Sequence, residues 1–88
     1  MIANDDHQIV SDGTTVWVNH VTGYCMARFG RMGIDIHNSP EDQERLGQCL
    51  HCTHGPTTEA DWQDFVEQVD RLFSIKVPEK FRPLRFGL

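Results

Sequence analysis

The seven residues from Cys49 to Gly55, CLHCTHG, hold the densest group of chemically active side chains in this sequence. Two thiols spaced as Cys-x-x-Cys can bind one zinc ion across a tight turn, but a structural zinc site needs four ligands. The chain contains no second Cys-x-x-Cys and no His-x-His pair, so the pattern is half of a zinc motif. The candidate ligands are Cys49, Cys52, His54 or His51, and then Cys25 or His37.

Cys49 and Cys52 also allow a thiol-dependent chemistry and a purely structural role. A redox-active Cys-x-x-Cys usually lies at the N-terminus of a helix, where the helix dipole lowers the thiol pKa. The next helix is predicted to begin at about residue 59, beyond Gly55 and Pro56, which places the thiols too far from it. We therefore predict a structural loop with both cysteines reduced and no cofactor bound. Zinc at Cys49, Cys52 and His54 is the alternative.

The length of 88 residues predicts a single domain over residues 1–88 with a modest core. No apolar run approaches the roughly 18–20 residues that a membrane span needs. The N-terminus is acidic where a signal peptide would be basic, so we expect a cytoplasmic protein. Three cysteines, an odd number, argue against a disulfide framework. The net charge of −5 disfavours nucleic acid as a partner.

Residues 14–37 predict three short strands, TTVWVN, YCMARF and GIDIH, separated by Gly-containing loops at residues 20–23 and 30–33. The first loop would set Trp17 opposite Met26, and the second would set Arg28 opposite Asp35. One face then collects Val16, Val18, Cys25, Ala27, Phe29, Ile34 and Ile36. The other face collects Trp17, Asn19, Tyr24, Met26, Arg28, Asp35 and His37. This alternation predicts an antiparallel meander with one buried face.

Two helices are predicted after the meander. Residues 38–47, NSPEDQERLG, have the cap, proline and terminal glycine of a short helix. Residues 58–61 resemble a capping box, and apolar residues then recur at helical spacing. This stripe consists of Trp62, Phe65, Val66, Val69, Leu72 and Phe73. The fold class is therefore α+β: a three- or four-stranded antiparallel meander with one long helix packed on one face and one short helix.

Both ends of the chain are predicted to lie outside the main elements. Residues 1–13 should be a loose N-terminal segment, although residues 9–10 could add an edge strand. Residues 75–77 could form a fourth strand. Residues 78–88 should be an extended basic tail, because two prolines favour extended backbone there. We expect this tail to dock on its own domain or on a partner.

The segments CMARFGRMGIDIH and CLHCTHGPTTEADWQDF together resemble short uncharacterised bacterial proteins of the kind carried on mobile gene cassettes. The resemblance covers most of residues 15–83. It implies no activity, cofactor or partner, so the function must be argued from the residues themselves.

The outer face of the predicted meander indicates a function more directly. Trp17, Tyr24 and Met26 would form a contiguous apolar cluster there, edged by polar side chains, and such a cluster is typical of protein interfaces. We therefore expect a cytoplasmic protein-interaction module of the adaptor or inhibitor type, without enzymatic activity. It would bind a protein partner or a second copy of itself, as a homodimer, through this face and the basic tail. The interface residues are Trp17, Asn19, Tyr24, Met26, Arg28 and His37. The alternative is a small zinc-binding or thiol-dependent protein organised around Cys49 and Cys52.

Overall fold

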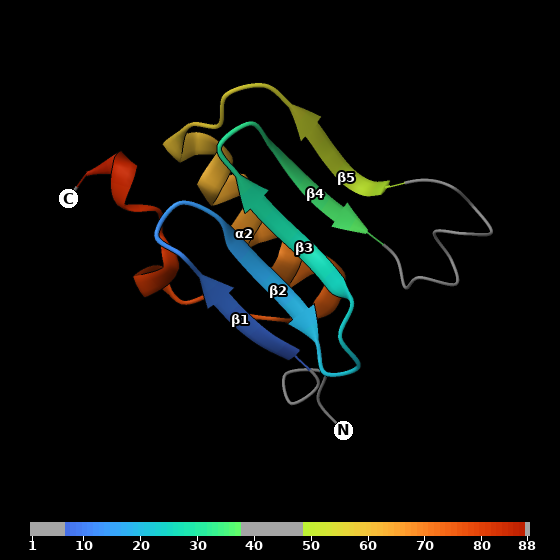
Figure 1. Cartoon of the computed structure of the whole chain (residues 1–88). Helices are drawn as coiled ribbons and strands as arrows, with labels where there is room; N and C mark the ends of the chain where they lie inside the picture. Colours follow the sequence, from blue (N-terminus) through green and yellow to red (C-terminus); the bar gives the residue numbers. More distant parts are fainter. Residues whose placement is uncertain (1–6, 38–48, 88) are drawn as a thin grey trace.

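The computed structural model describes residues 7–37 and 49–87 and folds them into a sheet and a helical layer. The five strands of the antiparallel sheet are β1 (His7–Ser11), β2 (Val16–His20), β3 (Cys25–Gly30), β4 (Gly33–His37) and β5 (Cys49–His54). They are followed by the helix α2 (Glu59–Phe73) and the short 3-10 helices η2 (Glu79–Phe81) and η3 (Leu84–Phe86). In Figure 1 the strands lie side by side in sequence order, and α2 crosses behind the sheet.

The α+β class and the long helix are confirmed, but the sheet has five strands where three or four were predicted. The edge strand β1 is longer than the one considered at residues 9–10, and it lies in a segment expected to be loose. The opposite edge strand, β5, replaces the predicted loop at the Cys-x-x-Cys pair. Ile75 and Val77 are buried without joining the sheet. The short helix predicted for residues 38–47 lies outside the described residues.

The hairpin of β3 and β4 has the predicted register. Its residue pairs include Ala27–Ile36, Arg28–Asp35 and Phe29–Ile34. Gly33, at the start of β4, also lies against the neighbouring strand β5. A Cβ atom at Gly33 would lie 2.4 Å from the carbonyl oxygen of Thr53, so the close approach of these two strands requires glycine.

The register of β2 and β3 differs from the predicted one for two reasons. The connecting loop is one residue shorter than expected, because His20 belongs to β2 and its N–H donates to the carbonyl of Tyr24 (2.8 Å). Met26 is then an extra residue in β3, which makes a β-bulge. The pairs on either side of this bulge are Asn19–Cys25 and Val18–Ala27.

Each of these two changes shifts the pairing by one residue. Together they shift it by two residues, so Trp17 lies opposite Arg28 instead of Met26. Because a shift by two residues keeps each side chain on its face, β3 has the predicted faces from Ala27 onward. Cys25 and Met26 lie between the shortened loop and the end of the bulge, where the pairing is shifted by only one residue. Their side chains therefore point to the faces opposite to the predicted ones. The predicted apolar face is therefore correct except at Cys25.

Helix α2 begins with the predicted capping box. The Thr58 hydroxyl accepts a hydrogen bond from the Asp61 N–H, and the Asp61 carboxylate accepts one from the Thr58 N–H. These bonds satisfy backbone donors that the start of a helix leaves free. The helix ends at Ser74, which has a left-handed conformation and donates its N–H to the carbonyl of Asp70. No helix among the residues described here has the length and apolar composition to cross a membrane.

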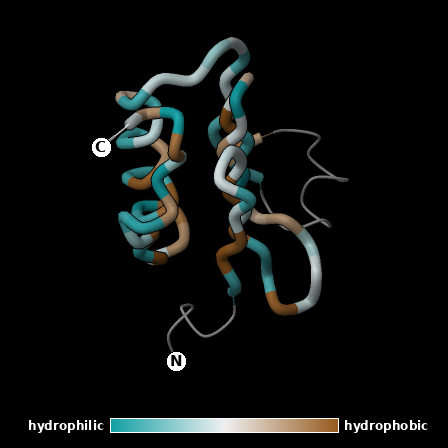
Figure 2. The backbone as a smooth tube through the Cα atoms, turned by 60° about the vertical axis from the view of Figure 1, so that its left-hand side comes forward, coloured by the Kyte–Doolittle hydropathy of each residue, from teal (hydrophilic) through white to brown (hydrophobic). Residues whose placement is uncertain are grey.

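The core lies between α2 and one face of the sheet, as Figure 2 shows with the sheet and the helical layer side by side. Trp62, Phe65 and Val69 of the helix are fully buried. The ring centroid of Phe29 in β3 lies 5.3 Å from that of Trp62 and 5.5 Å from that of Phe65. Aromatic pairs at such distances add to the free energy gained by burying apolar surface. The core also includes Ile75 and Val77 after the helix, and the sheet contributes Val16, Val18, Met26, Ala27, Ile34 and Ile36.

The C-terminal segment docks on its own domain. Pro83 is fully buried, and Phe81 and Phe86 pack against the core. Arg82 forms an ion pair with Glu59 in the first turn of α2. The segment predicted as an extended basic tail is therefore two short 3-10 turns bound to the fold.

We predict that Phe65→Ala lowers the free energy of unfolding by about 3–5 kcal/mol, because it leaves a cavity beside Phe29 and Trp62. Urea unfolding followed by circular dichroism measures the change. Glu67→Ala, at an exposed position of the same helix, should change it by less than about 0.5 kcal/mol. Equal midpoints for Phe65→Ala and the wild type would contradict the packing of α2 on the sheet.

Candidate functional site

One face of the sheet is covered by α2 and the C-terminal segment, and we call the opposite face the open face. Successive side chains of a strand point to opposite sides, so the pairing registers decide which residues reach it. These residues include Val10, Trp17, Asn19, Cys25, Arg28, Asp35, His37, Cys49, Cys52 and His54. All three cysteines of the chain therefore lie on the same face.

The bulge at Met26 decides which side chains of β3 reach the open face. Met26 is 7% exposed and belongs to the core, whereas Cys25 is half-buried and lines a hollow on the open face. The sequence predicted the reverse for both residues. The cluster expected from Trp17, Tyr24 and Met26 is accordingly not formed, because Met26 points into the core and Tyr24 stacks on His20, with ring centroids 4.9 Å apart.

A second bulge, at Leu50 in β5, brings the Cys-x-x-Cys pair onto one face. Residues three apart in a regular strand point to opposite faces. Here Leu50 is an extra residue without a partner in β4, so Cys49 and Cys52 both point to the open face. The pairs on either side of Leu50 are Ile36–His51 and His37–Cys49.

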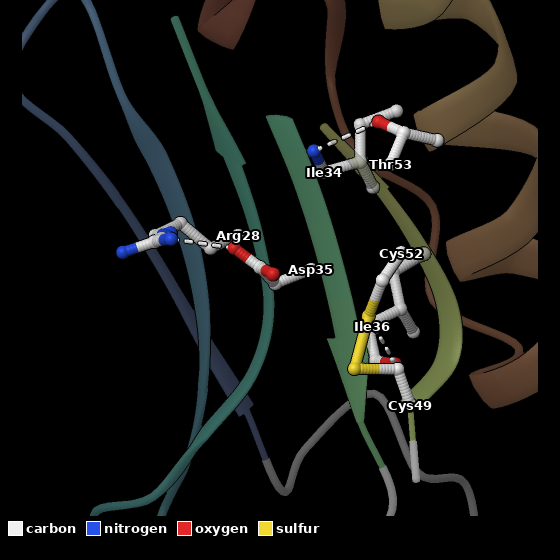
Figure 3. Close-up of a disulfide and its surroundings, with 7 residues drawn as sticks. All are labelled: Arg28, Ile34, Asp35, Ile36, Cys49, Cys52 and Thr53. Carbon is white, nitrogen blue, oxygen red and sulfur yellow. Dashed lines mark hydrogen bonds and ion pairs between the residues drawn. A yellow bond between two sulfur atoms is a disulfide. The ribbon is translucent and has the colours of Figure 1, made fainter. Parts of the chain in front are cut away.

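Cys49 and Cys52 form a disulfide, with their Cα atoms 5.9 Å apart. Figure 3 shows this bond on β5 beside β4, with the Arg28–Asp35 ion pair on the neighbouring strands. The prediction of a loop with reduced cysteines is therefore wrong on both points. Cys49 is exposed and Cys52 is half-buried, so the bond is accessible to molecules in solution.

His37 forms a compact cluster with the two cysteines. A ring nitrogen of His37 and the sulfur atoms of Cys49 and Cys52 all lie within 4.8 Å of one another. The register explains this, because His37 pairs directly with Cys49 and points to the same face. His54, the ligand predicted from sequence, is outside the cluster, since it pairs with Gly33 at the other end of β5.

His51, the substitute ligand considered from sequence, points to the opposite side of β5. Its Nε2 lies 2.8 Å from a carboxylate oxygen of Asp64 in α2. On the same strand, the Thr53 hydroxyl accepts a hydrogen bond from the N–H of Ile34 (3.1 Å). These contacts tie β5 to the rest of the fold on the core side and leave its other side to the disulfide.

Two shallow hollows flank the Arg28–Asp35 ion pair, which is the cross-strand contact predicted from the register. The first, of about 310 Å³, is lined by Trp17, Cys25, Arg28, Asp35 and His37, and it adjoins the cluster through His37. The second, of about 440 Å³, extends toward His54 and the loop between β3 and β4.

Four of the residues predicted for an interface lie on the open face. Trp17, Arg28 and His37 line the first hollow, and Asn19 is half-buried beside them in β2. Trp17 and Arg28 are neighbours because the observed register of β2 and β3 sets them directly opposite each other.

Cys25 is a free thiol, and burial raises its pKa above the ordinary value for cysteine. Its sulfur also donates to the carbonyl of Ala27 at 3.3 Å. The thiolate is the nucleophilic form of cysteine. The raised pKa therefore leaves less of Cys25 as thiolate at neutral pH than an exposed cysteine would have.

Comparison of the chain with protein-family models, curated proteins and solved structures finds no match.

We predict that protein purified without reductant has an intact mass lower by two hydrogen atoms than the sequence requires, because Cys49 and Cys52 are joined. After unfolding, the single reactive thiol should be Cys25. In the folded protein, iodoacetamide should alkylate Cys25 slowly at neutral pH and faster as the pH rises, since its pKa is raised. Three reactive thiols in the unfolded, unreduced protein would contradict this assignment.

Proposed function

We propose that this chain is a small thiol-dependent redox protein in which Cys49 and Cys52 alternate between a disulfide and a dithiol. The observation that carries the proposal is the position of the disulfide, on an edge strand and with Cys49 exposed. Exposed disulfides tend to be the labile, regulatory ones, whereas structural disulfides of secreted proteins resist reduction. In the cytoplasmic location that we propose, cellular thiols would act on this bond.

The fold is suited to both oxidation states. Because the bond closes a loop of only a few residues, it should contribute about 2 kcal/mol to stability. The aromatic core around Phe29 and Phe65 lies on the opposite face of the sheet and does not include the disulfide. The contact of His51 with Asp64 also holds β5 from the core side in either state. Reduction should therefore change the open face and leave the domain folded.

The reaction with a low-molecular-weight disulfide, such as oxidised glutathione, is balanced. The exposed Cys49 thiolate attacks one sulfur of that disulfide, which forms a mixed disulfide and releases one thiol. The Cys52 thiolate then attacks the sulfur of Cys49, which closes the protein disulfide and releases the second thiol. Two electrons pass from the protein to the glutathione disulfide. Reduction follows the same steps in reverse.

The position of the cysteine pair favours a redox-responsive protein over an oxidoreductase. In catalytic Cys-x-x-Cys motifs a helix N-terminus stabilises the attacking thiolate. Here the pair lies in β5, and Gly55 and Pro56 separate it from the start of α2 at Glu59. Within residues 7–37 and 49–87, therefore, no helix N-terminus lies at the pair to accelerate exchange with other proteins.

We predict one reversible two-electron transition when the protein is equilibrated with defined ratios of reduced and oxidised glutathione. The fraction of dithiol is read by mass spectrometry after alkylation in acid, starting from both oxidation states. The reduced protein should remain folded, with a free energy of unfolding about 2 kcal/mol lower.

Cys25→Ser is the matched control, because it removes the half-buried thiol that is not in the disulfide. It should keep the transition, whereas Cys52→Ser should abolish it. A disulfide that is reduced only when the protein unfolds would contradict the redox proposal.

A second candidate is the interaction module predicted from sequence, now limited to the open face. The observation that favours it is the half-exposed Trp17 beside the exposed Val10, which pair across β1 and β2 on the face that α2 does not cover. We propose a second copy of the chain as the partner, since two-fold pairing covers both patches with one contact. The C-terminal segment has no part in this candidate, because it is bound to its own core.

For this second candidate we predict a monomer–dimer equilibrium that Trp17→Ala weakens with little loss of monomer stability. Light scattering over a concentration series measures it. Leu84→Ala, which removes an exposed apolar side chain away from the open face, is the control and should leave the equilibrium unchanged. A wild-type monomer at the highest concentration would exclude the dimer.

A further inference from the structure

The cluster on the open face has the donor set of a metal site as well as of a redox pair. A ring nitrogen and two sulfur atoms, from His37, Cys49 and Cys52, lie within 4.8 Å of one another. Around one tetrahedral zinc ion, with bonds of about 2.0–2.3 Å, such ligand atoms would be about 3.5–3.8 Å apart. Once the disulfide is opened, the two sulfur atoms must separate to that distance, while the His37 nitrogen is already within 4.8 Å of both.

We infer that the reduced cluster of His37, Cys49 and Cys52 binds a borderline or soft divalent cation of the zinc class. This inference rests on the redox proposal, because the ligands are free only in the dithiol state. Two thiolates and one imidazole select zinc-like ions over magnesium or calcium, which prefer oxygen ligands. Among the described residues, the carboxylate of Asp35, which lies opposite Cys52 on the same face, is paired with Arg28.

The ligand set differs from the one that the Cys-x-x-Cys spacing suggests. Spacing alone pairs the cysteines with His54, two residues further along the chain. The strand geometry replaces His54 with His37, because β4 lies beside β5 and sets His37 opposite Cys49. His54 lies near the second hollow, on the other side of the ion pair from the cluster.

Oxidation and metal binding use the same sulfur electrons and exclude each other. When Cys49 and Cys52 form a bond, neither sulfur remains as a thiolate ligand. Oxidation by a glutathione-type disulfide would therefore release the ion, and reduction would restore the site. Among the described residues the cluster supplies three ligands, which leaves one position for water or another donor.

The test uses cobalt(II) as a spectroscopic probe and zinc(II) as a competitor on the full chain, reduced with a phosphine under anaerobic conditions. We expect thiolate-to-cobalt charge-transfer absorption, the visible bands of tetrahedral cobalt, and displacement by one equivalent of zinc. The oxidised protein should show none of these. His37→Ala should weaken cobalt binding roughly tenfold or more, since even loss of a residue that only supports a ligand costs that much.

Matched controls identify the ligands. His54→Ala and Cys25→Ser remove the same residue types from the same face and should bind cobalt as the wild type does, whereas Cys52→Ser should lose the charge-transfer band. Urea midpoints check that each variant folds, and if Cys52→Ser does not, the oxidised wild type serves as the dithiol-free control.

This ligand set would be overturned if His54→Ala weakened cobalt binding as much as His37→Ala does. It would also be overturned if Cys25→Ser weakened cobalt binding as much as Cys52→Ser does. Reversible redox cycling without cobalt binding would overturn the metal inference and leave the redox proposal standing. Failure of the redox proposal would appear separately, as a disulfide that glutathione cannot reduce in the folded protein.

Discussion

A β-strand presents its side chains alternately to two faces, so one extra residue exchanges the faces of everything beyond it. Two such residues, Met26 in β3 and Leu50 in β5, determine the chemistry of this domain. The first turns Cys25 out of the core and buries a methionine in its place. The second sets Cys49 and Cys52 on one side of a strand, although residues three apart would otherwise point to opposite sides. Without the second bulge, neither the disulfide nor the cluster with His37 would form.

The two faces of the sheet have separate physical roles. One face is closed by α2 and by the docked C-terminal segment, and it supplies the apolar burial that stabilises a domain of this size. The open face carries the disulfide, the Arg28–Asp35 ion pair and the two hollows. The disulfide and the ion pair lie outside the apolar core, so the oxidation or ion binding that we propose would change the open face and leave the core packing in place. This separation makes a reversible site compatible with a small core.

Local patterns were enough to predict the parts of the fold that depend on local interactions. The capping box at Thr58 and the apolar stripe through Phe65 specify α2, and the glycine-flanked loop specifies the β3–β4 hairpin with its Arg28–Asp35 pair. The bulges could not be predicted, because Met26 and Leu50 are ordinary apolar residues and no glycine marks either position. For the same reason β5 was interpreted as a loop, since its extra residue breaks the alternation of a strand. His37 was predicted on the outer face, but its contact with the cysteines requires pairing between strands that residues 38–48 separate in sequence.

In our proposal, His37 and the two cysteines of β5, but not Cys25, form one redox- and metal-responsive cluster. Nuclear magnetic resonance of protein labelled with carbon-13 at the cysteine Cβ atoms tests it most directly, in the oxidised, the reduced and the zinc-treated reduced states. We predict that the signals of Cys49 and Cys52 move on reduction and move again on addition of zinc, together with the ring signals of His37. The signal of Cys25 should stay close to one position in all three states. A cysteine pair that is already reduced without added reductant, or a zinc-dependent shift at Cys25 as large as that at Cys49, would contradict the account.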